Sequence, residues 1–370
     1  MLKFWRPKKG VCGLSMAYER KCEFYFTIAT QISACYMGSM SLSRRRTLAL
    51  LLSGPLAAAC GGGDAGAVLR LGYFPNITHA AALVGVEDGV FARHLGGTRL
   101  ETFTFNAGPA AIEALLSGSL DASYIGPNPA INGYVKSRGE AVRIIAGATS
   151  GGAFLVVRPD IAGADGLRGQ QVASPQLGGT QDVALRTWLK GQGFTTDAAG
   201  GGDVHVTPQE NAQTLERFRE GKLAGAWVPE PWASRMVIEG GGKVLVDERD
   251  LWPNRQYTTT VLLVRSEFLK NHPDRVEALL RGHVEVTGWV DKHRKDAQAK
   301  VNAALEKLTG KKISDEVIAR AFESLSFGTD PALASLEKSA HDAEALGLLK
   351  LEGVELAGIF DPALLKKVQG

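Results

Sequence analysis

Six short segments combine turn-forming residues with polar side chains where β-strands are predicted to end. Four of them share one arrangement, a small or glycine-containing turn followed by a Thr or Asn able to cap a helix, and then the helix. Unpaired N–H groups at a helix N-terminus carry the positive end of its dipole and bind oxyanions without Arg or Lys. The six segments are Asn76–His79, Asn106–Gly108, Gly126–Asn128, Ser150–Gly152, Gln176–Gln181 and Pro229–Trp232. Together at one sheet edge they predict a site for a sulfonate, phosphonate, nitrate or carboxylate group.

The sequence lacks the arrangements that enzymes and metal sites use. All four cysteines lie at or before Cys60, so the remainder has no disulfide, thiolate nucleophile or Cys-ligated metal. The seven histidines are scattered, and no Ser-His-Asp set, G-x-S-x-G, H-E-x-x-H or Walker loop occurs. We therefore expect no catalytic residues, no metal and no cofactor.

The charge distribution argues against nucleic-acid binding. The 370 residues include 42 Lys and Arg against 39 Asp and Glu. Residues 1–59 hold nine of the basic and two of the acidic residues, which leaves 33 basic and 37 acidic residues in 60–370. A mildly acidic body offers no basic stripe to a phosphate backbone. Its length and apolar content suit two packed domains.

The segment before Cys60 has the pattern of an export signal. We expect residues 40–59 to be a signal peptide, because Arg44–Arg46 precede an apolar run too short to span a bilayer. Leu56–Cys60 resembles a bacterial lipoprotein box, so Cys60 is the predicted lipidation site. The alternative is a plain signal peptide cut near Ala59, and the choice between Sec and twin-arginine export stays open.

Two further segments flank this signal. A signal peptide normally begins a chain, so residues 1–39 are interpreted as a non-native or mis-started extension. Residues 60–67 are predicted to be a lipid anchor and a flexible Gly-rich tether. The protein would then be periplasmic or at the cell surface, held to the membrane only through its lipid.

The body alternates predicted strands and helices, which favours parallel sheets flanked by helices. The series occurs twice, and Tyr257–Val264 forms a return segment. We therefore expect an α/β fold of two lobes, each a mostly parallel sheet, joined by two crossings. The first lobe comprises 68–157 and 258–370, with mainly helices from Asp274 onward, and the second comprises 158–257.

Four blocks carry a resemblance to a known family. They are Gly72–Ala80, Tyr124–Asn132, Pro175–Arg186 and Trp227–Arg235. They resemble the aliphatic sulfonate/nitrate/taurine branch of ABC-transporter substrate-binding proteins, and the resemblance covers roughly residues 68–367. It implies a type II periplasmic-binding-protein fold, with a ligand cleft between two lobes that close by hinge bending.

The resemblance also implies which residues line the cleft. One wall would hold Asn76, His79, Asn128, Ser150, Gly151 and Gly152. The other would hold Gly179, Thr180, Gln181, Glu230 and Trp232. Gly179 departs from the family, where Asn is frequent, which alters the expected head-group contacts.

Three of these side chains have two interpretations each. His79 lies in the first turn of a helix, whose dipole disfavours protonation, so it is a neutral donor or a packing residue. Trp232 either stacks on a ligand or belongs to the core. Glu230 pairs an amine on a zwitterionic ligand or, as we favour, pairs Arg235 at the hinge.

The resemblance implies a non-enzymatic receptor, expected to be a monomer, that captures a small anion and delivers it to an ABC permease and its ATPase. The alternative is a carrier for a pyrimidine or thiamin-precursor heterocycle on the same fold. An enzyme with a related fold synthesises a thiamin pyrimidine precursor, but its chemistry uses cysteines, which the body of this chain lacks.

Overall fold

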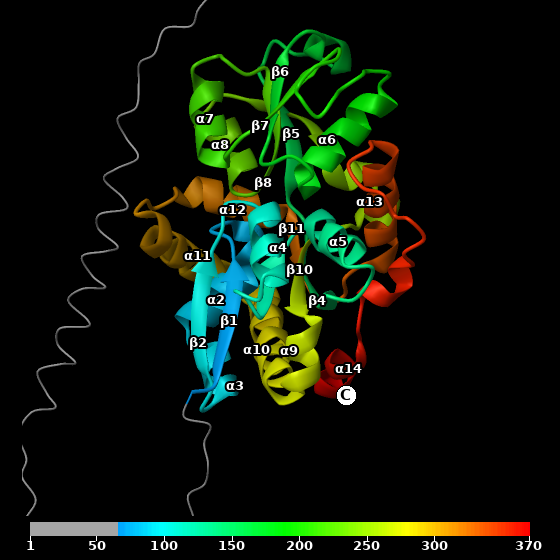
Figure 1. Cartoon of the computed structure of the whole chain (residues 1–370). Coiled ribbons are helices and arrows are strands. Elements are labelled where there is room, and N and C mark those ends of the chain that lie inside the picture. Colours follow the sequence, from blue (N-terminus) through cyan, green and yellow to red (C-terminus); the bar gives the residue numbers. More distant parts are fainter. Residues whose placement is uncertain (1–65) are drawn as a thin grey trace, which may run out of the picture. The chain divides into compact units, whose positions relative to one another are not determined.

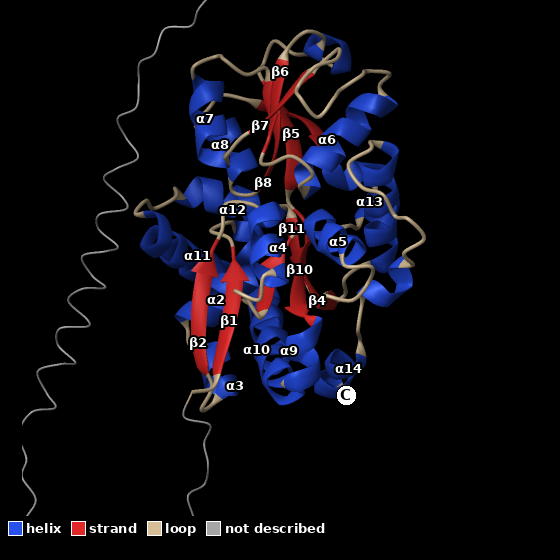
Figure 2. Ribbon diagram, viewed as in Figure 1, coloured by secondary structure: helices blue, strands red, loops and turns tan. Residues whose placement is uncertain are grey.

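The computed structural model describes residues 66–370. The predicted extension, signal peptide, Cys60 and tether up to residue 65 lie outside the described residues. From residue 66 onward the chain forms two sheets flanked by helices (Figure 1, Figure 2). Among the described helices, none combines the length and the apolar character that a membrane span requires.

The first lobe is built on a six-stranded sheet in the order β11-β4-β10-β3-β1-β2. The strands are β1 (Val68–Tyr73), β2 (Arg99–Thr104), β3 (Ala122–Ile125), β4 (Val142–Gly151), β10 (Thr258–Arg265) and β11 (Leu325–Phe327). Strand β1 runs parallel to both β2 and β3, whereas β10 runs antiparallel to β3 and β4. Successive side chains of β3 enter different cores, Tyr124 on one face and Ile125 on the other, because strand side chains alternate.

The second lobe is built on a five-stranded sheet in the order β7-β6-β8-β5-β9. The strands are β5 (Ala153–Val157), β6 (Gln171–Ser174), β7 (His205–Pro208), β8 (Gly225–Pro229) and β9 (Lys243–Asp247). Strand β6 runs parallel to β7 and β8, and β5 runs antiparallel to β8 and β9. Leu155 and Val156 of β5 point into separate cores on the two faces.

Helices cover both sheets. Those of the first lobe that precede the crossing are α2 (Ala80–Glu87), α3 (Val90–Leu95), α4 (Gly108–Leu116) and α5 (Pro127–Lys136), with a 3-10 turn η1 (Ile77–His79) ahead of α2. The second lobe contains α6 (Thr180–Gly191), α7 (Asn211–Arg219) and α8 (Trp232–Ile238). The C-terminal helices are α9 (Ser266–Asn271), α10 (Pro273–Lys292), α11 (Arg294–Thr309), α12 (Asp315–Glu323), α13 (Leu333–Ala345) and α14 (Ala363–Gln369).

The two-lobed α/β fold agrees with the sequence-based prediction. Most strands of each sheet run in one direction, and only β10 and β11 in the first described sheet and β5 in the second run the other way. The predicted lobe boundary differs in one detail. Strand β5, placed with the first lobe by the predicted boundary at residue 157, pairs in the second sheet. The apolar strands of both lobes look alike in sequence. Only the pairing of the strands shows where the chain passes from the first sheet to the second.

The chain passes between the sheets at Gly151–Gly152 and returns after β9. Both glycines have positive φ, 79° and 73°, which side chains rarely tolerate. A Cβ on Gly152 would lie 2.2 Å from a methyl carbon of Leu325. The Ser150 hydroxyl donates to the Tyr257 carbonyl at 2.5 Å, which joins the outgoing segment to the returning one. We refer to this crossing, residues 150–152, as the hinge.

The C-terminal helices contact both lobes, beyond the expected wrapping of the first. Helix α12 packs against α8, and α13 packs against both α5 and α6. The Lys190 ammonium at the end of α6 donates to the Ala345 carbonyl at 2.9 Å. The relative position of the lobes therefore depends on these helices as well as on the hinge.

Two buried carboxyl groups, those of Glu230 and Glu248, lie near the segments where the chain crosses between the lobes. Glu230 accepts hydrogen bonds from the Ser234 backbone N–H and hydroxyl at 3.0 and 2.8 Å, and its own N–H donates to the Gly152 carbonyl. Glu248 accepts from the Trp227 indole at 2.7 Å. Burial raises the pKa of each carboxyl to about 7, because an ionised group is poorly solvated there.

We predict that Glu230→Gln reduces the loss of stability as the pH rises from 5 to 8. Between the ordinary pKa of 4.5 and about 7, folded Glu230 keeps a proton that the unfolded chain has released, so its contribution falls as pH rises. From pH 5 to pH 8 the variant should gain roughly 2–3 kcal/mol of unfolding free energy relative to wild type. Urea denaturation at each pH measures the unfolding free energy of both proteins. Proton binding by the other groups affects both proteins alike and cancels in the difference.

The control is Glu337→Gln, which removes an exposed carboxylate from α13. A difference between wild type and Glu230→Gln that stays constant from pH 5 to pH 8 would contradict the buried, protonated Glu230.

Candidate functional site

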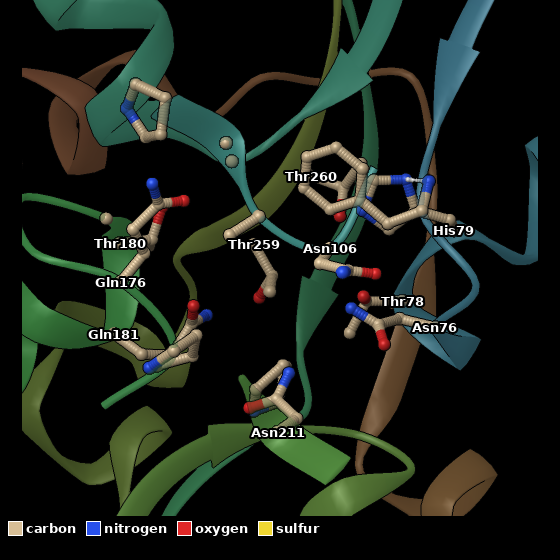
Figure 3. A pocket seen from close by; sticks show the side chains of 18 residues that line it. Asn76, Thr78, His79, Asn106, Gln176, Thr180, Gln181, Asn211, Thr259 and Thr260 are labelled. Atoms are coloured by element: carbon tan, nitrogen blue, oxygen red, sulfur yellow. Dashed lines mark hydrogen bonds between the residues drawn. The ribbon is translucent and has the colours of Figure 1, made fainter. Parts of the chain in front are cut away.

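A polar cavity of about 40 Å³ lies between the two lobes (Figure 3). Of the described residues, none that lines it is Asp, Glu, Lys or Arg. The polar side chains around it are Asn76, Thr78, His79, Asn106, Gln176, Thr180, Gln181, Asn211, Thr259 and Thr260. The other lining residues are Phe74, Ala107, Gly108, Gly126, Pro129, Pro175, Gly179 and Pro229. The cavity therefore offers hydrogen bonds but no opposing charge.

Four α-helices begin at this cavity, two from each lobe. Gly108 opens α4, Gly126 precedes α5, Gly179 precedes α6 and Asn211 opens α7. In the described chain, no side chain caps any of the four by a hydrogen bond. N–H groups of the first turns are therefore free to bind a ligand, except at Pro109 of α4 and at Pro127 and Pro129 of α5, which have none. The four dipoles make the cavity favourable to negative charge.

Small residues let the helix starts approach one another. A Cβ on Gly126 would lie 2.4 Å from the Thr180 hydroxyl of the opposite lobe. A Cβ on Gly108 would lie 2.2 Å from the ring of Pro129. Larger residues at either position would push the helix starts apart, so the glycines serve packing as well as N–H exposure.

Three buried polar atoms at the cavity lack partners. They are the Thr180 and Thr260 hydroxyls and Oδ1 of Asn211, none of which has a hydrogen-bond partner among the described residues. Leaving such a group unpaired costs about 1–3 kcal/mol. A ligand oxygen accepting from the two hydroxyls would remove part of that cost, and turning the Asn211 amide would present its Nδ2 instead.

His79 supplies a neutral donor. Its Nδ1 accepts from the Phe74 backbone N–H at 3.3 Å, and its ring stacks on Phe74 with centroids 4.5 Å apart. The proton of the neutral ring is therefore on Nε2. Burial lowers the pKa of His79 to about 3. His79 is therefore neutral, as predicted, but for another reason. Desolvation, rather than the helix dipole, is the main cause of its lowered pKa.

Hydrogen bonds hold the lobes together on two sides of the cavity. The Trp232 indole donates to Oδ1 of Asn76 at 2.9 Å, and Nδ2 of Asn106 donates to Glu210 at 2.7 Å. Each bond links a cavity residue of the first lobe to a side chain of the second. The structure is therefore a closed arrangement of the cleft.

The structure brings five of the sequence-predicted residues together at the cavity and leaves six elsewhere. Those that line it are Asn76, His79, Gly179, Thr180 and Gln181. Those that do not are Asn128, Ser150, Gly151, Gly152, Glu230 and Trp232.

Each of the six has another role. The Asn128 amide donates to the Ser339 carbonyl of α13. Residues 150–152 form the hinge crossing. Glu230 is held by Ser234, and its favoured pairing with Arg235 is wrong, because Arg235 binds Glu239 at 3.0 Å. Trp232 lies beside the cavity and contacts Asn76.

Sequence reasoning missed several lining residues. Asn211 follows strand β7 at a helix start, so the strand-end rule should have included it. Thr259 and Thr260 belong to a strand that begins, rather than ends, at this edge of the sheet. Their signal is a run of three threonines opening an otherwise apolar segment. Within residues 66–370 no group of three or more His, Cys, Asp or Glu is placed to hold a metal.

The chain is similar to known binding proteins. It is 26% identical over 205 residues to the taurine-binding periplasmic protein of Escherichia coli (strain K12), a match over 55% of this chain and 61% of that one. It is 26% identical over 257 residues to the bicarbonate-binding protein CmpA of Synechococcus sp. (strain ATCC 27144 / PCC 6301 / SAUG 1402/1), over 62% of this chain and 55% of the relative. The chain thus spans about six-tenths or less of these relatives' lengths.

A solved structure agrees in fold. The alkanesulfonate-binding protein SsuA from Xanthomonas axonopodis pv. citri, bound to MOPS, superimposes with a TM-score of 0.67 at 17% identity, covering 80% of this chain and 98% of SsuA. The fold is that of the periplasmic binding proteins. The model of the NMT1-like family matches residues 64–306, well over half of the sequence, and the chain therefore belongs to that family.

Proposed function

We propose that the protein is the solute receptor of an ABC importer and captures a small oxyanion between its lobes. The observation that carries this proposal is the convergence of four uncapped helix N-termini on a cavity that no charged side chain of residues 66–370 lines. An anion there is stabilised by N–H groups, hydroxyls and a neutral imidazole. The relatives named for taurine and bicarbonate, and the structure bound to MOPS, support this ligand class.

The lining favours an oxyanion over the heterocycle carrier. A planar heterocycle is usually held between aromatic faces, and Phe74 is the one Phe, Tyr or Trp among the described lining residues. Phe74 is also occupied, because it stacks on His79. A compact head group such as a sulfonate, nitrate or bicarbonate suits a small cavity rich in hydrogen-bond donors.

The binding cycle follows from the two lobes. We infer that the unliganded protein is mainly open and that the anion, bridging helices of both lobes, shifts the population toward the closed form. The closed receptor would then deliver its ligand to the permease and ATPase. No catalytic group is needed for this cycle, which is consistent with relatives named as binding proteins.

Export and anchoring complete the proposal. A relative named as periplasmic supports an exported protein, and the signal pattern before Cys60 supports a lipid anchor. The receptor would act as a monomer at the outer face of the membrane, close to its permease.

The function is tested by adding taurine, alkanesulfonates, nitrate, bicarbonate, phosphonates, carboxylates and pyrimidines separately and measuring thermal unfolding, with calorimetry to confirm. A ligand at 100 times its dissociation constant adds about 2.7 kcal/mol of stability. We expect a shift with one class of oxyanion. A shift with pyrimidines alone would favour the heterocycle carrier, and no shift with any oxyanion would contradict the proposal.

We predict that Thr180→Val weakens binding of that oxyanion by roughly 1.5–3 kcal/mol, because it removes a donor to a buried charge. Without ligand the variant should be as stable as wild type or slightly more so, since the hydroxyl has no partner there. Calorimetric titration of both proteins measures the difference.

Thr187→Val is the matched control. It removes another unpartnered hydroxyl from the same helix, α6, at a position that does not line the cavity. Equal affinity of wild type and Thr180→Val would remove this helix start from the site.

We predict that Cys60→Ser shifts the protein from the membrane fraction to the soluble fraction without changing its oxyanion affinity. Lipidation requires the thiol, whereas the residues that line the cavity all lie between 74 and 260 and do not include Cys60. Fractionation of cells expressing each form measures this. A Cys60→Ser protein that still sediments with membranes would refute the lipid anchor.

A further inference from the structure

Trp232 and Asn76 meet across the two lobes. Trp232 opens α8 in the second lobe, and Asn76 precedes η1 in the first. The indole Nε1 lies 2.9 Å from Oδ1 of Asn76. Asn76 is 7% exposed and lines the cavity, whereas Trp232 is only partly buried and does not line it. The asparagine therefore connects the tryptophan to the cavity.

This contact fixes the orientation of the Asn76 amide. An indole N–H only donates, so the atom facing Trp232 must be the carbonyl oxygen of the amide. Nδ2, with two donors, is then turned to the other side, and Figure 3 shows it on the cavity side. The hydrogen bond from Trp232 uses the amide oxygen and leaves both N–H donors of Nδ2 for other partners. Nδ2 is thus available to a bound anion, whereas a reversed amide would present a repulsive oxygen.

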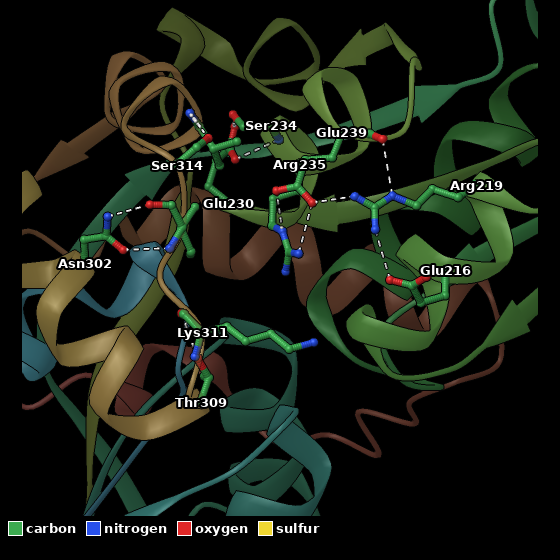
Figure 4. Close-up of polar contacts among 12 residues, drawn as sticks. Glu216, Arg219, Glu230, Ser234, Arg235, Glu239, Asn302, Thr309, Lys311 and Ser314 are labelled. Carbon is green, nitrogen blue, oxygen red and sulfur yellow. Dashed lines mark hydrogen bonds and ion pairs between the residues drawn. The ribbon is translucent and has the colours of Figure 1, made fainter.

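Trp232 has contacts of its own within the second lobe. The Arg235 guanidinium lies 4.9 Å above its ring. Glu239 accepts two hydrogen bonds from Arg235 at 3.0 Å each and a further one from Arg219 at 2.8 Å (Figure 4). Ser234, in the same helix turn, is anchored to buried Glu230. The position of the indole is therefore supported by its own lobe and does not depend on Asn76.

We propose that Trp232 is a positioning residue for anion binding. When the lobes close, its indole N–H turns the Asn76 amide so that Nδ2 faces the ligand, which makes one cavity donor conditional on closure. This inference rests on the proposed function, since it assigns a role to a residue beside the same site. Trp232 contributes selectivity for negative charge without touching the anion.

The test is a double-mutant cycle on oxyanion affinity. Ethanesulfonate, taurine, nitrate and bicarbonate serve as probes, and the one that wild type binds most tightly is used. Trp232→Phe keeps an aromatic ring under Arg235 but removes the donor, and should weaken binding about threefold to tenfold. Asn76→Ala should weaken it at least as much. The double variant should equal Asn76→Ala alone, because Trp232 acts through Asn76.

Lys190→Met is the control for general loss of contact between lobes. This substitution removes an exposed hydrogen bond between the lobes, from Lys190 to the Ala345 carbonyl. Lys190 does not line the cavity, so the affinity of the variant should stay within twofold of that of wild type. If the effects of Trp232→Phe and Asn76→Ala multiply in the double variant, Trp232 acts independently of Asn76 and the inference fails. If wild type binds none of the probes, both the inference and the proposed function fail.

A second readout does not depend on the variants' affinity. The Trp232 indole N–H resonance, assigned by its loss in Trp232→Phe, should exchange with solvent more slowly once the probe anion saturates wild type. An exchange rate unchanged by the bound anion would overturn the closure-dependent hydrogen bond.

Discussion

The four uncapped helix starts are the constraint on which the rest of the structure depends. Without capping side chains, the N–H groups that their non-proline residues carry need another partner, and α4 and α5 face α6 and α7 across the cleft. Glycines at 108 and 126 let the helix starts come together. Because the field of the helices already favours an anion, lysine and arginine are not needed at the cavity, and a ligand without a counter-ion pair can be released again.

In the proposed binding cycle, polar groups that are poorly satisfied in the closed cavity would give the ligand its effect on conformation. The Thr180 and Thr260 hydroxyls are buried without partners, and His79 stays neutral because burial lowers its pKa to about 3. Closing without an anion therefore carries the cost of these unpaired groups, and closing around one removes part of it. In that cycle the hinge glycines at 151 and 152 would allow the lobes to move, and the helices α12 and α13, which contact both lobes, would limit the movement. In the closed form alone, Trp232 would orient the Asn76 amide so that its Nδ2 donates to the anion.

The two lobes could be predicted from the sequence, and so could those site residues whose position depends only on the neighbouring strand and helix. Asn76, His79 and Gly179–Gln181 lie where a strand passes into a helix, so pattern alone places them at the cavity. Glu230 could not be placed, because its direction depends on Ser234 and on burial. Asn128 could not be placed either, because its amide reaches a carbonyl 211 residues away. Thr259 and Thr260 were missed because β10 runs antiparallel and begins at the edge where β3 ends.

The most direct test of the central claim is a crystal structure of the protein with an oxyanion that it binds in solution. The account predicts anion oxygens within hydrogen-bond distance of backbone N–H groups at the starts of α6 and α7 in one lobe and of α4 or α5 in the other. The Thr180 hydroxyl would donate to the anion, and no lysine or arginine would touch it. An anion paired with a cationic side chain, or bound outside the cavity between the lobes, would contradict the account.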